Sequence, residues 1–518
     1  MQAPPGSEKL SYVVGRVIIE GAFGELANQT RPLVAAIEGQ RVTVAQIYDF
    51  ANALEEIYAR AGYVLVRVTV PPQSLRDNGV LRIAVTDGFI EDVQVDRVPA
   101  QARALVAARS RMLIGRGHIT LAQLERVLLT AGDIPGLRLK STLARGSSPG
   151  GSLLVLDGEH RLVTGTANVG NQLPASLGTW SYGGSLAINT PFGYGEQFYG
   201  SAQTAGDTSK VFQPDSPLRT LGAGIVVPLG LDGWTLNPEY TYSRSVPIPV
   251  SGGVDSIGYF QRFALRTNYS IIRTRSETLS INGGYEHISQ EVALPQFDTD
   301  LNRDKYSVLR GGIGYETALP FAGAGIQASA TFSRGLGGRD QNDALQSGIP
   351  LSRQGAGPVF NKLSADLRYS QPLFESVRLD VTGRMQTSFR RPVLASEQFA
   401  LDGQQAISAF ANGTFNVDEG ATVRGELSRP FNVPGAGIPL VLSPYGFAAY
   451  GAGRLNNATI LEVASMRASA FGVGLRSSID LPGGYTALIL GIEAARQYSN
   501  LPNYPHGWRT NVNISLRF

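Results

Sequence analysis

From about residue 163 to the end of the chain, apolar and polar side chains alternate with a period of two. Residues 234–243 show an apolar, largely aromatic face opposite a polar one, and the segments 363–370 and 377–386 repeat this alternation. Successive side chains of a β-strand point to opposite faces of the sheet, so the spacing indicates strands with one apolar and one polar face. The pattern predicts a long series of amphipathic strands.

Before residue 160 the pattern is different, because strand-like and helix-like segments alternate. Residues 12–21 are β-branched and bounded by glycine, and residues 43–62 carry apolar side chains at helical spacing up to Gly62. Further strands are expected at 63–70, 79–85 and 88–95. A second helix, with a cap at Thr120, is followed by two strands around a Gly/Ser/Pro turn. This order of helix-like and strand-like segments predicts two small α+β units, 12–96 and 97–162, after a short extension of residues 1–11.

The strand-rich part, residues 163–518, resembles a membrane barrel more than a soluble β-protein. Repeated strands with an apolar-aromatic face and a polar face fit a barrel with a wet lumen and a lipid-facing exterior. The end of the chain carries the same signal, because Trp508, Val512, Ile514 and Leu516 alternate with polar residues and the chain finishes on Phe518. We therefore expect a transmembrane antiparallel β-barrel whose closing strand ends at Phe518.

Composition removes several other classes of protein. The chain has 518 residues, no Cys and a net charge of +3, and no run of about 18 apolar residues is present. A helical membrane protein, a nucleic-acid binder, a disulfide scaffold and a thiol nucleophile are therefore disfavoured. The four His are far apart, and short Gly-x-Gly stretches lie within strand patterns. We expect no metal, no cofactor and no enzyme activity.

Ordered motifs through nearly the whole chain resemble the TpsB transporters of two-partner secretion, relatives of BamA in the outer-membrane superfamily that joins POTRA (polypeptide-transport-associated) domains to a barrel. Residues 166–198 are similar to the family's first barrel hairpin, with Glu196 where Asp is usual. The landmarks of the first POTRA domain are Gly62, Tyr63, Pro71, Gln73, Val85 and Gly88. Those of the second are Asp133, Pro135, Gly136 and the turn at Pro149 and Gly150.

The resemblance implies a function. Periplasmic POTRA domains would capture an unfolded TpsA-type β-helical exoprotein, and a barrel of sixteen strands in the outer membrane of a Gram-negative bacterium would pass it to the cell surface without ATP. Outer-membrane lipid and lipopolysaccharide would surround the barrel, and the barrel assembly machinery would recognise its C-terminal strand. The implied protein is a monomer with no nucleic-acid partner.

The family's lid loop folds back into the lumen and carries a Val-Arg-Gly-Tyr-like tip. Both flanks of this loop are present here, Ser396, Glu397, Gln398 and Phe399 before it, and Asp418 and Gly420 after it. Their spacing places the lid at about 402–420. The tip then falls on Ile407, Ser408, Ala409 and Phe410, so that Ser408 stands where the tip Arg is usual.

The stretch Val-Arg-Gly at residues 423–425 lies after the second flank, inside the next strand. Arg424 and Glu426 should then face the lumen from the wall. Ala449 and Gly451 stand where the family has the Phe and Asp that receive the lid Arg. Both halves of that latch are missing together, so we expect a lid held by Phe410, Phe415 and hydrogen bonds from Ser408, or a more mobile one.

Two other interpretations of the function stay open from the sequence. An assembly factor of the BamA or TamA type shares the barrel but carries three or more POTRA domains and keeps the lid Arg. A passive β-barrel channel would not need a POTRA pair. Pro4, Pro5 and Gly6 in the short extension disfavour the plug helix that family members often carry.

Overall fold

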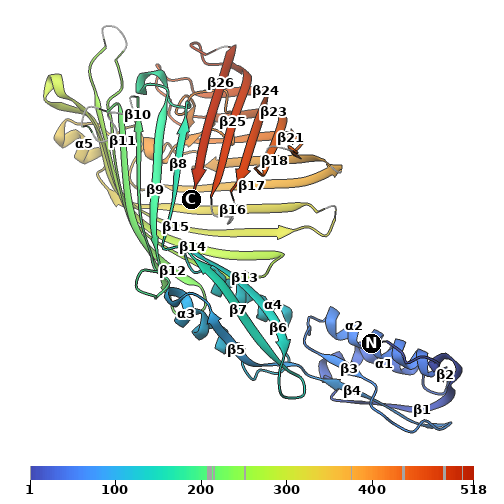
Figure 1. Cartoon of the computed structure of the whole chain (residues 1–518). Helices are drawn as coiled ribbons and strands as arrows, with labels where there is room; N and C mark the ends of the chain where they lie inside the picture. The colour runs from blue at the N-terminus through green and yellow to red at the C-terminus, as the bar shows by residue number, and fades with distance from the viewer. Residues whose placement is uncertain are drawn as a thin grey trace. The chain divides into compact units, whose positions relative to one another are not determined.

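The structure is a computed structural model that describes residues 2–206, 213, 216–249, 253–321, 323–374, 376–434, 438–481, 486–504 and 506–518. The chain divides into two compact units (Figure 1). One holds residues 1–160 with the short segment 273–275, and the other holds the remaining residues of 161–518. Among the described residues, no helix is long and apolar enough to cross a membrane.

The first domain of the N-terminal unit is a four-stranded sheet in the order β2-β1-β4-β3 with two helices. Its main helix α2 (Val44–Arg60) begins with a capping box, in which the side chains of Thr43 and Gln46 accept each other's backbone N–H. Side chains of α2 and the sheet bury one apolar core that includes Leu54 and Ile83. The other elements are η1 (Ser7–Lys9), β1 (Ser11–Glu20), η2 (Gly24–Leu26), α1 (Ala27–Ala35), β2 (Arg41–Thr43), β3 (Arg67–Thr69) and β4 (Gly79–Thr86).

The second domain is a three-stranded sheet in the order β5-β7-β6, with its own core around Ile90, Val106 and Leu154. Helix α4 (Leu121–Gly132) starts with a capping box at Thr120. The other elements are β5 (Phe89–Arg97), α3 (Ala100–Ser110), η3 (Arg111–Leu113), β6 (Leu137–Arg145) and β7 (Gly151–His160).

The division between these domains differs from the one expected from the sequence. The strand expected at 88–95 was placed in the first domain, but β5 pairs in parallel with β7 of the second. Strand patterning gives no information about which sheet a strand joins, and only the parallel partner decides it. The strand expected at 63–70 is also shorter, because only β3 joins the ladder of β4.

The POTRA landmark residues occupy turns and close approaches of the backbone. Gly62 has φ +93° just after α2, a left-handed conformation that favours glycine. At Gly88 a Cβ would lie 2.1 Å from the carbonyl oxygen of Leu65, so no larger residue fits. The side chain of Gln73 hydrogen-bonds both backbone groups of Arg82, at 2.7 and 2.8 Å, and so continues the edge of β4 beyond β3.

The other landmarks lie nearby. Tyr63 donates from its hydroxyl to Glu25 at 3.1 Å, and Val85 is buried in the first core. Asp133 follows α4 as its C-terminal cap, and Pro135 and Gly136 form the turn before β6. Pro71 accepts a hydrogen bond from the Gln73 amide at 3.3 Å. These contacts fix local turns of the two domains.

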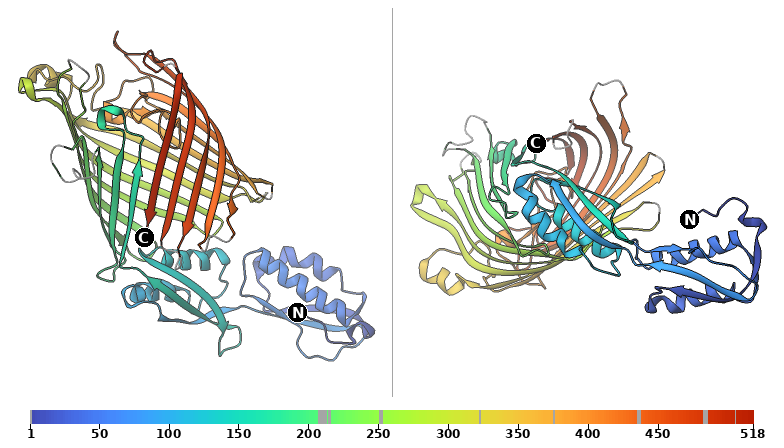
Figure 2. Two further views of the ribbon diagram at one scale, coloured as in Figure 1. Left: turned by 45° about the horizontal axis from the view of Figure 1, so that its top comes forward. Right: turned by 60° about the horizontal axis from the view of Figure 1, so that its bottom comes forward.

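The second unit is a closed antiparallel barrel (Figure 2). Sixteen strands close it when β21 and β22, which pair with the same neighbour β23, are counted as one strand in the described part of the chain. The fold class expected from the sequence is confirmed. The strands are β8 (Val163–Gly170), β9 (Ser181–Asn189), β10 (Gln197–Ala205), β11 (Leu218–Leu229), β12 (Trp234–Ser245), β13 (Ile257–Arg273), β14 (Glu277–Leu294), β15 (Thr299–Ala318), β16 (Gly325–Gly338), β17 (Asn361–Phe374), β18 (Val377–Thr387), β21 (Glu419–Ser428), β22 (Phe431–Asn432), β23 (Leu440–Arg454), β24 (Ser465–Asp480), β25 (Ala487–Ser499) and β26 (His506–Arg517).

The barrel closes where the last strand meets the first. Strand β26 pairs with β8, and Phe518 exchanges two backbone hydrogen bonds with Gly165, at 2.8 and 3.0 Å. The Phe518 ring lies over Gly165, where a Cβ would meet it at 2.6 Å. Many large apolar side chains of the strands are exposed, including Leu186, Phe263, Leu309, Ile313, Val473 and Ile492, as an exterior in lipid requires.

Short elements interrupt the connections between strands. The segment between β18 and β21, residues 388–418, is called the lid below; it contains η7 (Ala395–Glu397) and the small hairpin of β19 (Phe399–Ala400) and β20 (Asn416–Val417). The expected lid at 402–420 therefore begins earlier, and its last two residues belong to strand β21. Other connections contain η4 (Ala175–Leu177), η6 (Pro295–Phe297) and α5 (Gln341–Ser347).

Candidate functional site: the lid and the barrel wall that holds it

The lid folds into a compact hairpin. Its two arms pair through β19 and β20, and Asp402 accepts backbone hydrogen bonds from Gly413 and Phe415 at 2.9 and 2.8 Å. Phe410 and Phe415 pack edge to face with their ring centroids 4.8 Å apart. These contacts fix the tip, residues 407–410, in one conformation.

The lid tip is buried against the barrel wall in an apolar cluster. Ile407, Ala409 and Phe410 are almost completely inaccessible to solvent. The facing wall consists largely of small side chains on β23, β24 and β25, which leave room for the lid. These wall residues are Ala449, Ala468, Ala470 and Ala495, flanked by Tyr445 and Phe447.

Gly451 lies on β23 where the lid tip closely approaches the wall. A Cβ at Gly451 would lie 2.8 Å from Cδ1 of Ile407 and 3.0 Å from Cγ2 of Thr422. A side chain here, an aspartate included, would force the end of the Ile407 side chain to shift. Ala449, at the neighbouring inward position, is 5% exposed and packs in the same cluster.

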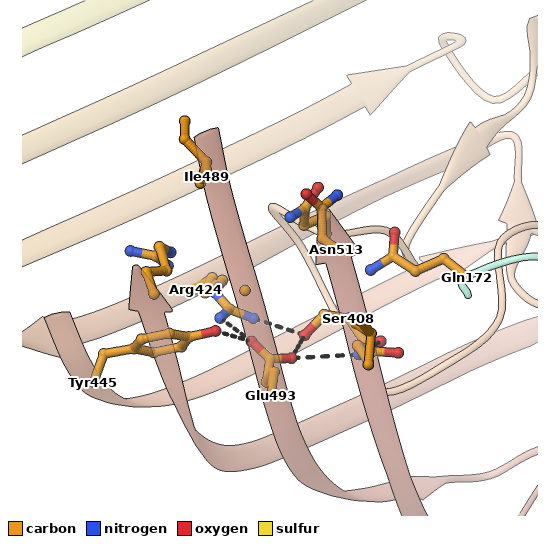
Figure 3. Close-up of a pocket in the computed structure, with 12 residues that line it drawn as sticks. Gln172, Ser408, Arg424, Tyr445, Ile489, Glu493 and Asn513 are labelled. Carbon is orange, nitrogen blue, oxygen red and sulfur yellow. Dashed lines mark hydrogen bonds and ion pairs between the residues drawn. The ribbon is translucent and has the colours of Figure 1, made fainter. Parts of the chain in front are cut away.

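The polar contact between lid and wall centres on Ser408 (Figure 3). Its hydroxyl donates to the carboxylate of Glu493 on β25 and accepts a hydrogen bond from Nη1 of Arg424 on β21, at 2.8 Å. The Ser408 carbonyl accepts from Nδ2 of Asn511 on β26, at 2.7 Å. Three wall strands therefore contact the single lid residue Ser408.

Arg424 is the buried charge of this contact. Its Nη2 lies 2.7 Å from Glu493 and 3.4 Å from Glu426, and its guanidinium stacks 3.7 Å above the ring of Phe447. Arg424 and Glu493 are both buried, and Tyr445 donates its hydroxyl to Glu493 at 3.1 Å. A buried guanidinium with two carboxylates and an aromatic face is compensated in charge, so it can stay ionised next to the lid.

The base of the lid is anchored by a second buried group. Glu397, at the end of η7, lies 2.7 Å from both Arg310 on β15 and Lys362 on β17. Its side chain is 1% exposed and also accepts a hydrogen bond from the hydroxyl of Tyr306 at 3.1 Å. Ser396 shares a hydrogen bond with the same tyrosine at 2.7 Å. The first flank is therefore an ionic anchor.

The second flank forms another anchor. Asp418 is fully buried and lies 3.4 Å from Arg353, and the backbone N–H of Asn456 donates to it at 2.7 Å. Gln398 reaches the same carboxylate at 3.4 Å. At Gly420 a Cβ would lie 2.9 Å from the carbonyl of Ala452, so the strand passes its neighbour too closely for a larger residue.

The sequence placed the lid tip, the two flanks and the wall residues in one region, and the structure brings them together. Phe399 packs in the lid cluster, and Glu426 pairs with Arg424 and with Arg476, at 2.6 Å from the latter. Sequence reasoning missed the partners that lie on distant strands. These are Glu493, Asn511, Arg310, Lys362 and Arg353.

The contacts at this site hold a loop against the barrel wall through hydrogen bonds and apolar packing. Among the described residues, no group of His, Cys, Asp and Glu could hold a metal ion. No nucleophile with an adjacent base is formed, because Ser408 donates to a carboxylate that a guanidinium already neutralises. The arrangement holds the lid tip against the inner wall of the barrel.

Comparisons with known proteins identify the family and relatives that this chain resembles. Residues 150–477 match the family model for haemolysin secretion/activation protein ShlB/FhaC/HecB, and residues 13–88 match the ShlB-type POTRA domain. The chain is 23% identical over 431 residues to the outer membrane transporter CdiB of Escherichia coli, covering 82% of this chain and 70% of that protein. It is 23% identical over 459 residues to the hemolysin transporter protein ShlB of Serratia marcescens, covering 83% and 75%. The solved structure of CdiB from Escherichia coli aligns with a TM-score of 0.74 at 20% identity, covering 100% of this chain and 92% of that one.

Proposed function

The chain belongs to the haemolysin secretion/activation family ShlB/FhaC/HecB, and from that premise we propose how its lid and domains carry a polypeptide across the outer membrane. The protein is an outer-membrane transporter of two-partner secretion, not an enzyme, and its cargo is a secreted exoprotein. The finer steps rest on the contacts of the lid, whose tip packs against the inner wall in a buried apolar cluster.

The closed lid blocks the path of the exported chain. Its tip is held by side-chain hydrogen bonds through Ser408 and by apolar packing, while its base is anchored at Glu397 and Asp418. A buried ion pair is costly to break when only one partner is lost, so the anchors stay in place while the tip is released. Transport then requires the tip to leave Arg424 and Glu493, with the base acting as a hinge.

The orientation of the barrel follows from its ends. Strand β8 begins directly after the POTRA domains, and the C-terminal Phe518 is hydrogen-bonded to Gly165 near that start. Both ends therefore lie at the same rim, which is the periplasmic one if the POTRA domains lie in the periplasm. The lid and the connection 339–360 then enter from the opposite, extracellular rim.

The partners follow from the surfaces. An unfolded β-helical exoprotein would be captured by strand addition at a POTRA sheet edge, and β6, whose residues 140–145 are mostly exposed, is such an edge.

We assign residues 12–88 to the first POTRA domain, 89–162 to the second and 163–518 to a monomeric barrel. Lipid and lipopolysaccharide would cover its apolar exterior, and the assembly machinery would read the strand that ends at Phe518. No ATP is needed if folding outside prevents return.

A locked lid tests this function. Because the chain has no Cys, the pair Ser408→Cys and Asn511→Cys can be joined by a short dibromoalkane that alkylates both thiols with loss of bromide. The matched control is Thr166→Cys with Ser185→Cys, whose hydroxyls lie 2.8 Å apart across neighbouring wall strands β8 and β9. Locking the lid should stop secretion of the exoprotein, and the control lock should not.

The experiment also separates the alternatives. An assembly factor would leave secretion intact but reduce the amount of other barrels in the outer membrane when the gene is deleted. A passive channel would change small-solute uptake alone. Either result, with the exoprotein still in the medium, would overturn the proposed function.

A further inference from the structure

Below the lid, the inner wall forms a hollow of about 460 Å³. Strands β17, β18, β21, β23 and β24 contribute to its lining, together with the lid residues Gln404 and Gln405. Four arginines line it, Arg368, Arg378, Arg424 and Arg476, against two carboxylates. A smaller hollow of about 70 Å³ adjoins it and shares Gln404, Arg424 and Arg476.

Three of the four arginines are neutralised by ion pairs. Arg378 lies 3.1 Å from Asp380, Arg476 lies 2.6 Å from Glu426, and Arg424 lies 2.7 Å from Glu493. Arg368 is exposed and forms no ion pair with any residue that the structure describes. The hollow therefore carries one uncompensated guanidinium, with three more close to its surface.

The register of the sheet puts the donors in one row. Arg368 on β17 pairs with Thr382 on β18, and Thr382 pairs with Arg424 on β21. Neighbouring strands lie roughly 4.8 Å apart, so the two guanidinium-bearing positions lie about 10 Å from each other with a hydroxyl between them. This row presents N–H and O–H donors to one side, which is the arrangement that carboxylates accept.

The lid contributes two neutral amide side chains to the lining of this hollow. Within residues 401–410, the side chains of Gln404 and Gln405 are exposed while those of the tip are buried. Neither amide is hydrogen-bonded to any described residue. A side-chain amide has the shape of a carboxylate but no charge, so it would be a weak partner for guanidinium groups.

We propose that this hollow is a binding site for carboxylate side chains of the exported polypeptide, which compete there with the Gln404–Gln405 turn of the lid. The proposal rests on the function proposed above. An acidic segment of the passing chain would pair with Arg368 and reach Arg424, drawing that guanidinium away from Ser408. Binding of cargo would thereby release the lid tip.

Current block in planar bilayers tests the site directly. A peptide of six glutamates should block the open pore more strongly than one of six lysines. The double variant Arg368→Gln with Arg378→Gln should weaken that block at least about tenfold, because charge-assisted hydrogen bonds are lost. Arg517→Gln, an exposed charge of β26 outside the hollow, serves as the matched control and should leave the block unchanged.

The lid offers a second test that does not remove any wall residue. Gln404→Glu with Gln405→Glu should lower the open probability about fivefold at low salt, and this effect should vanish near 1 M salt, where charges are screened within about 3 Å. Gln404→Lys should act in the opposite direction. Equal block by both peptides, equal competition by inorganic phosphate, or no effect of the Glu variants would overturn the carboxylate site.

The two proposals can fail separately. If the exoprotein is secreted but the arginine and glutamine variants behave like the wild type, the carboxylate site fails and the transport function stands. If no exoprotein depends on the chain, the transport function fails whatever the peptides do.

Discussion

The guanidinium of Arg424 on the barrel wall donates to the hydroxyl of Ser408 on the lid tip, with 2.8 Å between the two heavy atoms. The charge of this contact belongs to the wall, and the lid contributes only a neutral hydroxyl. Glu493 completes the contact by pairing with Arg424 and accepting from Ser408. When the lid moves away, Arg424 and Glu493 still neutralise each other, so opening leaves no buried charge without a partner.

Ser408→Ala should favour the open lid. The substitution removes hydrogen bonds to both wall groups while Arg424 and Glu493 keep each other, so the closed state should lose about 1–2 kcal/mol, roughly five- to thirtyfold in the closed-to-open ratio. Single-channel recording measures this ratio. Ser515→Ala, a polar position of the closing strand away from the lid, should leave gating unchanged.

Gly451→Ala should also loosen the lid, through shape alone. The added methyl group would lie 2.8 Å from Ile407, and overpacking of this kind costs about 1–3 kcal/mol. Ile407→Val in the same chain shortens the opposing side chain and should recover much of the closed population. A double-mutant cycle of open probability checks this, and additive effects of the two changes would contradict the steric account. Gly451→Asp paired with Ser408→Arg should not restore tight closure, because the carboxylate has no room.

Glu397→Gln should destabilise the base of the lid. The change leaves Lys362 buried without its nearby carboxylate, and loss of one partner of a buried ion pair costs about 3–5 kcal/mol. The temperature at which the barrel loses its folded electrophoretic mobility should fall. Glu316→Gln, an exposed position on β15, is the control, and an equal shift in both variants would contradict the anchor.

The second POTRA domain should lose stability in acid through Glu91. Hydrogen bonds from the Ser147 hydroxyl, and from the backbone of Ser148 and Ser147, hold the pKa of Glu91 below its ordinary value. A carboxyl group with a lowered folded pKa stabilises the fold above its unfolded pKa of about 4.3, and this contribution disappears as pH falls through the folded pKa. Thermal unfolding of residues 1–160 by circular dichroism should show a smaller acid-induced decrease in Glu91→Gln than in the wild type. If thermal unfolding of the two proteins depended on pH in the same way, Glu91 would not be the cause of the loss of stability in acid.

Much of the architecture could be predicted from the sequence, because strand periodicity and helix caps are local properties. The alternation from residue 163 onward predicts the barrel, the alternation up to Phe518 predicts its closing strand, and Thr120 predicts the start of α4. The interval usual in the family that the chain resembles predicts the lid tip at residues 407–410, and these residues are buried. Val-Arg-Gly was excluded from the lid because it lies after the second flank, in agreement with the alternation, and Arg424 lies on β21.

Only the tertiary structure decided which distant residues meet. Strand β5 joins the second sheet because its parallel partner β7 lies more than fifty residues later in the chain, and no local pattern encodes that choice. Glu493 and Asn511 reach Ser408 because a closed barrel brings its last strands beside the lid. Arg310 and Lys362 meet Glu397 for the same reason. The sequence determines which face of a strand each of these side chains occupies, while the shear and closure of the barrel determine its partner.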